Sequence, residues 1–204
     1  MSQVQVYAYL GPIRQICRGC PTTTLNEAYI AAVRRFCHES KWFQSTLIGA
    51  TILDEPTYNL GSDPYSEIIG VRAIALADTA TSTVDLIEQS SALWNPNDTH
   101  DTPEFFEYTP EAQFSVHPKP DAVYSLTIAL TLQPKIGSNS LDDSLINKWD
   151  LAFRSGALGY LMRIPGMAWT DKNEANQQET RFVDWINKGA SAAEKRYDIG
   201  MTPW

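Results

Sequence analysis

Residues 123–132 read VYSLTIALTL, and bulky apolar side chains occupy every second position. On one face of an extended chain this pattern places Tyr124, Leu126, Ile128, Leu130 and Leu132. A period of two indicates a strand with one buried and one wetted face, which is typical of antiparallel sheets. The stretch therefore predicts a sheet in the second half of the chain.

The same kind of signal recurs upstream of this stretch. Apolar and β-branched runs cover residues 46–53, 68–76 and 84–87, and turn residues separate them. Short strands divided by turns favour an antiparallel sheet or a small sandwich over parallel β-α-β units. We therefore expect a β-rich module over residues 44–138.

Both ends of the chain show helical spacing instead. Three helices are predicted, over residues 24–41, 140–163 and 171–197. Thr24, Ser140 and Asp171 are the residues expected to cap their N-termini. The chain is thus predicted to be α+β, a three-helix scaffold split between residues 1–43 and 139–204 and interrupted by an antiparallel β-module.

The net charge of −8 is unevenly distributed. Residues 54–113 hold twelve acidic side chains and one basic side chain, Arg72. Proteins whose main affinity is for nucleic acid instead gather Lys and Arg on their surface, so that class is disfavoured. The acidic stretch can be a solvated surface, a face that meets a basic partner, or a face that repels DNA passing nearby.

Residues 89–113 are predicted to form a long acidic loop. Turn-forming residues dominate it, yet Trp94, Phe105, Phe106 and Tyr108 stand among them. Loops of this length are functional or disordered in most proteins. Two readings stay open here: the aromatic side chains pack back onto the edge of the sheet, or they form an arm that docks a partner.

The sequence contains no motif of catalysis, and we expect neither catalytic residues nor a cofactor. Phosphate-binding glycine loops, zinc-protease motifs and nucleophile elbows are missing, and the three histidines accompany no nucleophile. Cys17 and Cys20 form a C-x-x-C, but the strand that precedes a redox site and the second cysteine pair of a zinc site are lacking. We expect these cysteines to be small buried residues, although metal binding at this turn stays open. A site assembled from scattered carboxylates is the enzymatic alternative, and nothing in the pattern supports it.

The N-terminus lacks the basic and apolar regions of a secretory signal, and no apolar run is long enough to span a membrane. A soluble intracellular product is therefore expected.

Several residues are candidates for an interface. Gly156 and Gly159 stand inside a predicted helix, where glycine is unfavourable, so they indicate close approach of another backbone, within the bundle or between subunits. Trp169 follows that helix, and Met201 and Trp204 belong to an apolar tail. Such a tail can fray, fold back or insert into a neighbour.

Two segments carry a resemblance to a known family. The first helix ends in RRFCHESKW over residues 34–42, and the second continues into GALGYLMRIPGMAW over residues 156–169. With the β segment between them, closing on residues 124–134, this order resembles the head-to-tail adaptor proteins of short-tailed bacteriophages. The likeness spans nearly the whole chain.

The resemblance implies a structural virion protein. Such adaptors form a ring, usually a dodecamer, between the portal of the head and the tail nozzle, and DNA passes through without specific binding. It implies a place at the head-tail junction of the virion, and in the host cytoplasm during assembly. It also implies that residues 195–204 contact the portal. The alternative is a monomeric virion-associated or host-directed binding module that acts through residues 89–113.

Overall fold

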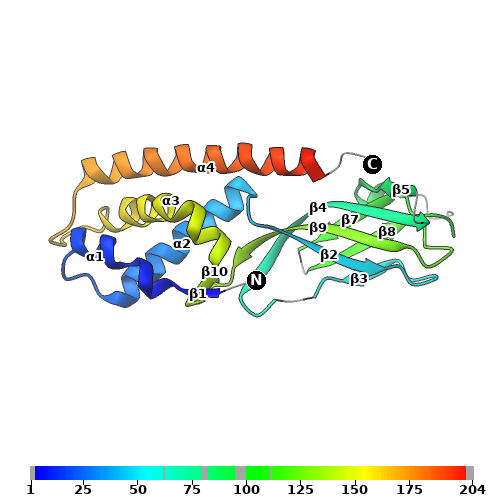
Figure 1. Ribbon diagram of the computed structural model, residues 1–204, viewed down its shortest axis with the longest axis horizontal. Coiled ribbons are helices and arrows are strands. Elements are labelled where there is room, and N and C mark those ends of the chain that lie inside the picture. Colours follow the sequence, from blue (N-terminus) through cyan, green and yellow to red (C-terminus); the bar gives the residue numbers. More distant parts are fainter. Residues whose placement is uncertain (1–2, 62, 80–81, 95–99, 111, 201–204) are drawn as a thin grey trace. The chain divides into compact units, whose positions relative to one another are not determined.

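The computed structural model describes residues 3–61, 63–79, 82–94, 100–110 and 112–200. The chain divides into two compact units (Figure 1). The helical unit comprises Met1–Phe43 and Gln133–Trp204, and the β unit comprises Gln44–Leu132. Helices account for 41% of the chain and antiparallel sheets for 30%, so the predicted α+β class is confirmed. The second boundary lies at residue 132, earlier than the expected 138.

The helical unit contains three long helices that contact one another, α2 (Thr22–Ser40), α3 (Asp143–Leu161) and α4 (Lys172–Gly200). Three smaller elements precede α2, namely β1 (Gln3–Gln5), a 3-10 turn η1 (Val6–Tyr9) and a short helix α1 (Gly11–Ile16). Strand β1 pairs antiparallel with β10 (Ser140–Asp142), which runs directly into α3. The start of the chain is therefore fastened to the start of α3.

The helix starts differ from two of the three predicted caps. Ser140 lies in β10, and Asp142 caps α3 because its Oδ1 accepts a hydrogen bond from the Ser144 amide at 2.9 Å. Helix α2 begins two residues before Thr24, behind Pro21, and no side chain caps it. Asp171 caps α4 as predicted, since its Oδ1 accepts bonds from the amides of Asn173 and Glu174 at 3.0 Å each.

Aromatic side chains fill the centre of the helical unit. Phe36 of α2 is fully buried, with its ring centroid 4.9 Å from that of Trp149 and 5.4 Å from that of Phe153, both on α3. Trp185 of α4 completes the group against Trp149 at 6.2 Å. Burial of each such ring contributes about 1.5–3 kcal/mol, so this cluster is a main source of the unit's stability.

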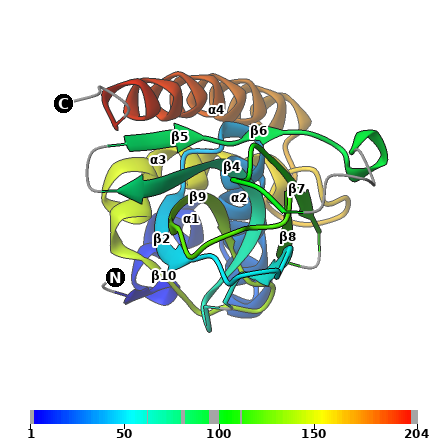
Figure 2. The ribbon, with the colours of Figure 1, turned by 90° about the vertical axis from the view of Figure 1, so that its right-hand side faces the viewer.

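The described residues of the β unit form eight strands in two four-stranded sheets, and Figure 2 shows this unit from its end. The first sheet has the order β2-β9-β4-β5, formed by β2 (Gln44–Ala50), β9 (Ser125–Pro134), β4 (Ser66–Thr79) and β5 (Ser82–Asp85). The second has the order β3-β8-β7-β6, formed by β3 (Thr57–Asn59), β8 (Gln113–His117), β7 (Phe105–Thr109) and β6 (Ile87–Glu88). The pair β6–β7 is parallel, whereas β2–β9, β3–β8, β4–β5 and β7–β8 are antiparallel.

The inner faces of both sheets are apolar. Strand β9 buries Leu126, Ile128 and Leu130, as its alternation predicted, and the other sheet buries Phe106 and Phe114. The chain passes from one sheet to the other at residue 86, between β5 and β6. The two buried faces make this unit a small sandwich.

Candidate functional site

The two predicted helix glycines lie inside the helical unit. A Cβ added to Gly156 would come within 2.8 Å of Ala32 Cβ in α2 and 2.9 Å of Phe182 Cζ in α4. At Gly159 the nearest atoms are the Ala175 carbonyl oxygen and the Glu179 amide nitrogen, both at 3.4 Å. Both glycines are buried. The close approach that they indicated is therefore a contact within the bundle and not a contact between subunits.

The other candidates in this unit lie after α3. Trp169 stands in the turn-rich link between α3 and α4 and is half-buried. The implied portal-contacting segment begins in the last turns of α4, where Lys195 is exposed. Met201 and Trp204 lie outside the described residues.

The aromatic residues of the expected loop 89–113 pack back onto the β unit. Phe105 and Phe106 belong to β7, and Phe106 is 1% exposed in the sandwich core. The prediction that Phe106 lies in an exposed docking arm was therefore wrong. Their alternation was hidden because β7 has only five residues and polar turn formers precede it. Trp94 stacks on the ring of His117 in β8, with 5.0 Å between centroids and 10° between planes.

The carboxylate of Glu107 bonds to the residues that precede Trp94. Hydrogen bonds from Ser91 and Ser90 lower the pKa of Glu107, which stands on β7. Residues 89–94 are thereby tied to the second sheet. Of the two readings, packing onto the sheet describes Trp94.

The cysteines are buried free thiols. Burial, followed by the neighbouring Cys20, raises the pKa of Cys17 to about 11, and burial also raises the pKa values of Cys20 and Cys37. A raised pKa keeps a thiol protonated, which is the opposite of what nucleophilic or redox chemistry requires. Within the described ranges, no group of three His, Cys, Asp or Glu side chains has the arrangement of a metal site.

Two pairs of adjacent acidic residues, Asp142–Asp143 and Asp54–Glu55, lie at a helix start and at a turn. Asp142 caps α3, and Asp143 lies in the first turn of that helix. Asp54 has a left-handed backbone conformation at a turn, and its Oδ1 is in contact with Nε2 of His100. Asp54 and His100 are both well exposed, so this pair lacks the enclosed environment that tunes catalytic carboxylates.

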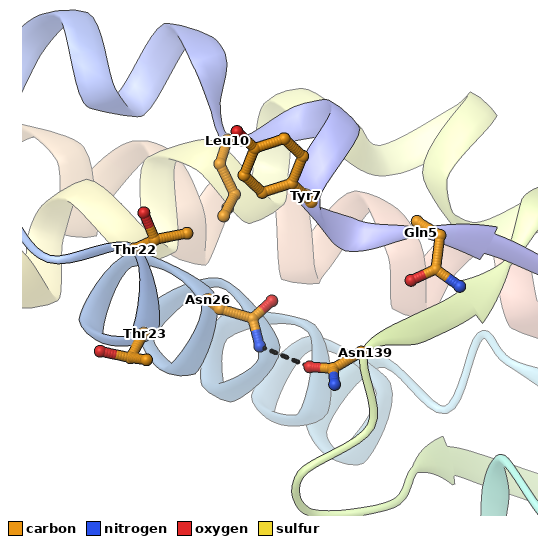
Figure 3. Close-up of a pocket in the computed structure, with 7 residues that line it drawn as sticks. All are labelled: Gln5, Tyr7, Leu10, Thr22, Thr23, Asn26 and Asn139. Atoms are coloured by element: carbon orange, nitrogen blue, oxygen red, sulfur yellow. Dashed lines mark hydrogen bonds between the residues drawn. The ribbon is translucent and has the colours of Figure 1, made fainter.

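The helical unit has an open pocket of about 260 Å³ beside the start of α2 (Figure 3). Its lining consists of Gln5, Tyr7, Leu10, Thr22, Thr23, Asn26 and Asn139. The Asn26 amide donates a hydrogen bond to Asn139 Oδ1 at 3.1 Å, which joins α2 to the segment before β10. All seven lining side chains are uncharged, so the pocket suits hydrogen bonding to an uncharged segment better than acid–base chemistry.

The two units differ in net charge. The β unit holds thirteen carboxylates against two cationic side chains, Arg72 and Lys119, and the helical unit holds fourteen cationic side chains against eleven carboxylates. The excess negative charge seen in residues 54–113 is therefore a property of the whole β unit.

Sequence reasoning missed one exposed surface, the outer edge of β2. Residues 46–50 are all exposed, and Ile48 is 79% exposed. The available signal was the strand's composition, since QSTLIGA over residues 44–50 contains no charged residue. The position of this strand at a sheet edge, however, depends on the order of all four strands.

Comparison with protein-family models and with curated proteins found no match. In the part of the chain that the structure describes, no helix is both long and apolar enough to cross a membrane.

Proposed function

We propose that this chain is a subunit of a ring-shaped head-to-tail adaptor of a short-tailed bacteriophage, seated between the portal and the tail nozzle. The proposal starts from the resemblance of residues 34–42 and 156–169. The main observation in its support is where those residues lie in the helical unit. Phe36 lies in the aromatic core, and Gly156 lies where α2, α3 and α4 meet. The segments that resemble the family are thus the ones that fix the geometry of the helical unit.

A closed ring requires two different complementary faces on each subunit. Leu151 and Tyr160 of α3 are 61% and 60% exposed, although most of that helix is buried. They are nine residues apart, and at about 100° per residue this places them on opposite sides of the helix. Two exposed apolar side chains on opposite sides of one helix suit a head-to-tail contact repeated around an axis.

The charge distribution suits a conduit for DNA. A channel that binds phosphate would slow its cargo, and a surface with thirteen carboxylates and two cations avoids that affinity. Our hypothesis is that residues 54–113 line the channel. A structure of the assembled ring with this segment on its outer surface would contradict this part of the proposal.

The test is co-assembly with the portal protein encoded in the same genome. Native mass spectrometry of the full chain with portal rings is expected to show a complex with a fixed ratio, twelve subunits for a dodecamer. A monomer in the absence of portal does not decide the question, because a subunit can assemble only on its partner. A chain that stays monomeric in the presence of portal rings would rule the proposal out.

Matched variants locate the subunit contact. Leu151→Ser and Tyr160→Ser each alter one exposed side chain of α3 and are expected to reduce the yield of the ring complex. Val84→Ser is the control, because Val84 of β5 is also exposed, at 49%. The portal contact is tested separately by removing residues 201–204, which is expected to weaken attachment to the portal.

A further inference from the structure

Among the strands that the structure describes in the β unit, one sheet edge lacks the usual protection. Natural edge strands avoid pairing with other chains by being short, by carrying charges or proline, or by bulging. Strand β2 has seven residues without charge or proline, and its register with β9 is continuous from Gln44↔Thr131 to Ala50↔Ser125. Its outer edge is therefore a regular template for another strand.

The other sheet edges of this unit differ from β2. Strand β3 has three residues and β6 has two. Strand β5 has four residues, includes Asp85, and is irregularly paired with β4 between Ala77 and Thr79. Protection is thus present on these three described edges and is missing from β2.

The backbone groups that face the open edge follow from the pairing. The Thr51 amide donates to the Tyr124 carbonyl at 2.8 Å, so Thr51 is directed towards β9. Antiparallel strands alternate between residues that bond to the partner and residues that point away from it. The N–H and C=O groups of Thr46, Ile48 and Ala50 are therefore directed outward, three donors and three acceptors along one line.

An apolar tip continues this edge. Ile52, Leu53 and Val123 are 61%, 54% and 69% exposed. Hydrogen bonds hold the tip in place, because the Asp54 amide donates to the Pro120 carbonyl at 3.0 Å and the Tyr58 hydroxyl accepts from the Ile52 amide at 3.1 Å. The backbone that carries Ile52 and Leu53 is thus held in a defined turn.

Carboxylates lie next to the tip residues in the sequence. Asp54, Glu55 and Asp121 are all exposed, and Asp54 is in contact with His100. An occupant of the edge would meet this negative charge at the end of β2. Pairing between the β2 edges of two copies is disfavoured, since each β unit carries thirteen carboxylates and two cations and the two would repel.

We propose that the open edge of β2 binds an extended segment of a partner protein that is rich in basic and apolar residues. The segment adds a strand to the first sheet through Thr46, Ile48 and Ala50. Its apolar side chains cover Ile48 and the tip, and its Lys or Arg side chains lie beside the carboxylates. This is recognition by strand addition, in which backbone bonds give affinity and side chains give specificity. The inference does not depend on the ring proposed above.

The test uses the full chain and a fluorescein-labelled decapeptide of alternating valine and lysine with blocked ends. In fluorescence anisotropy, this probe is expected to bind about tenfold more tightly than the same peptide with glutamate in place of lysine. Binding is expected to slow hydrogen exchange at the amides of Thr46, Ile48 and Ala50. Equal affinity for both peptides, or protection confined to other amides, would overturn the proposal.

Two variants of Ile48 distinguish the contribution of its backbone N–H to peptide binding from that of its side chain. Ile48→Pro removes one outward N–H without breaking the β2–β9 ladder, and it is expected to weaken binding about tenfold. Ile48→Ala keeps the N–H and is expected to weaken it about threefold or less. Ala50→Pro gives a second proline variant if the first fails to fold. Equal effects of proline and alanine would overturn the proposal, and so would a dimer of the chain alone that Ile48→Pro dissociates, since a second copy would then be the occupant.

Discussion

Gly156 of α3 lies so close to Ala32 of α2 that a Cβ on the glycine would come within 2.8 Å of the alanine Cβ. It would also come within 2.9 Å of Cζ of the buried Phe182. Alanine favours a helix over glycine by about 1 kcal/mol, whereas overpacking a core costs about 1–3 kcal/mol. Because the Ala32 Cβ moves only with its helix, we expect Gly156→Ala to lower the free energy of unfolding by about 1–2 kcal/mol. Urea denaturation followed by circular dichroism at 222 nm measures this change.

Gly159→Ala is the matched control, one turn further along the same helix. Its added Cβ would meet its nearest atoms at 3.4 Å, so the gain in helix propensity is retained. We expect a free energy of unfolding that is unchanged or raised by up to about 1 kcal/mol. If both substitutions destabilise the protein equally, close packing at Gly156 is not the reason for its glycine.

Tyr29 makes stability depend on alkaline pH. Its hydroxyl donates to Asp150 Oδ1 at 2.8 Å, and burial, reinforced by Asp150, raises its pKa far above the usual 10.0. Above pH 10 the unfolded chain releases this proton while the folded chain keeps it. The contribution of this hydroxyl to the free energy of unfolding is therefore complete below pH 10. Above pH 10 it declines by up to about 1.4 kcal/mol per pH unit.

The variant Tyr29→Phe tests this dependence. At pH 9 it is expected to be about 1 kcal/mol less stable than the wild type, because one hydrogen bond is lost. Asp150 remains paired with Arg154 in the variant. The difference is expected to shrink between pH 10 and pH 11, as measured by urea denaturation at each pH. A difference that stays constant across this interval would contradict the raised pKa of Tyr29.

The thiols are expected to be unreactive in the folded protein. Cys17 and Cys37 are 0% exposed and Cys20 is 7% exposed, and all three pKa values are raised. At pH 8, a thiol-specific disulfide reagent is expected to label none of them in the native chain within minutes and all three in denaturant. Cys20→Ser identifies the least buried thiol if one reacts early. Rapid labelling of the native chain would instead indicate that the turn between α1 and α2 opens.

Local patterns predicted those features that depend on local chemistry. The alternation in residues 123–132 predicted β9 and its buried face, and Asp171 predicted the start of α4. Ser140 was misassigned because its partner in the sheet, Gln5, lies 135 residues away, and no local signal reports such a contact. For the same reason the glycine at Gly156 predicted a close approach but could not name Ala32 as the neighbour. The open edge of β2 depends on strand order, which is also a property of the whole chain.

The last prediction concerns the independence of the helical unit. The β unit is entered at Gln44 and left at Leu132, and Gln44 is the register partner of Thr131. Paired residues on antiparallel strands are about 4.5–5.5 Å apart, so a short linker can join the two ends of the helical unit. A chain in which a glycine–serine linker replaces residues 44–132 is therefore expected to fold, with the helical circular dichroism of the unit and a cooperative thermal transition. Phe36→Ala in this shortened chain is the control and is expected to remove about 3–5 kcal/mol of stability, because its ring lies in the aromatic core. A shortened chain that lacks a cooperative transition would show that the helical unit requires the β unit to fold.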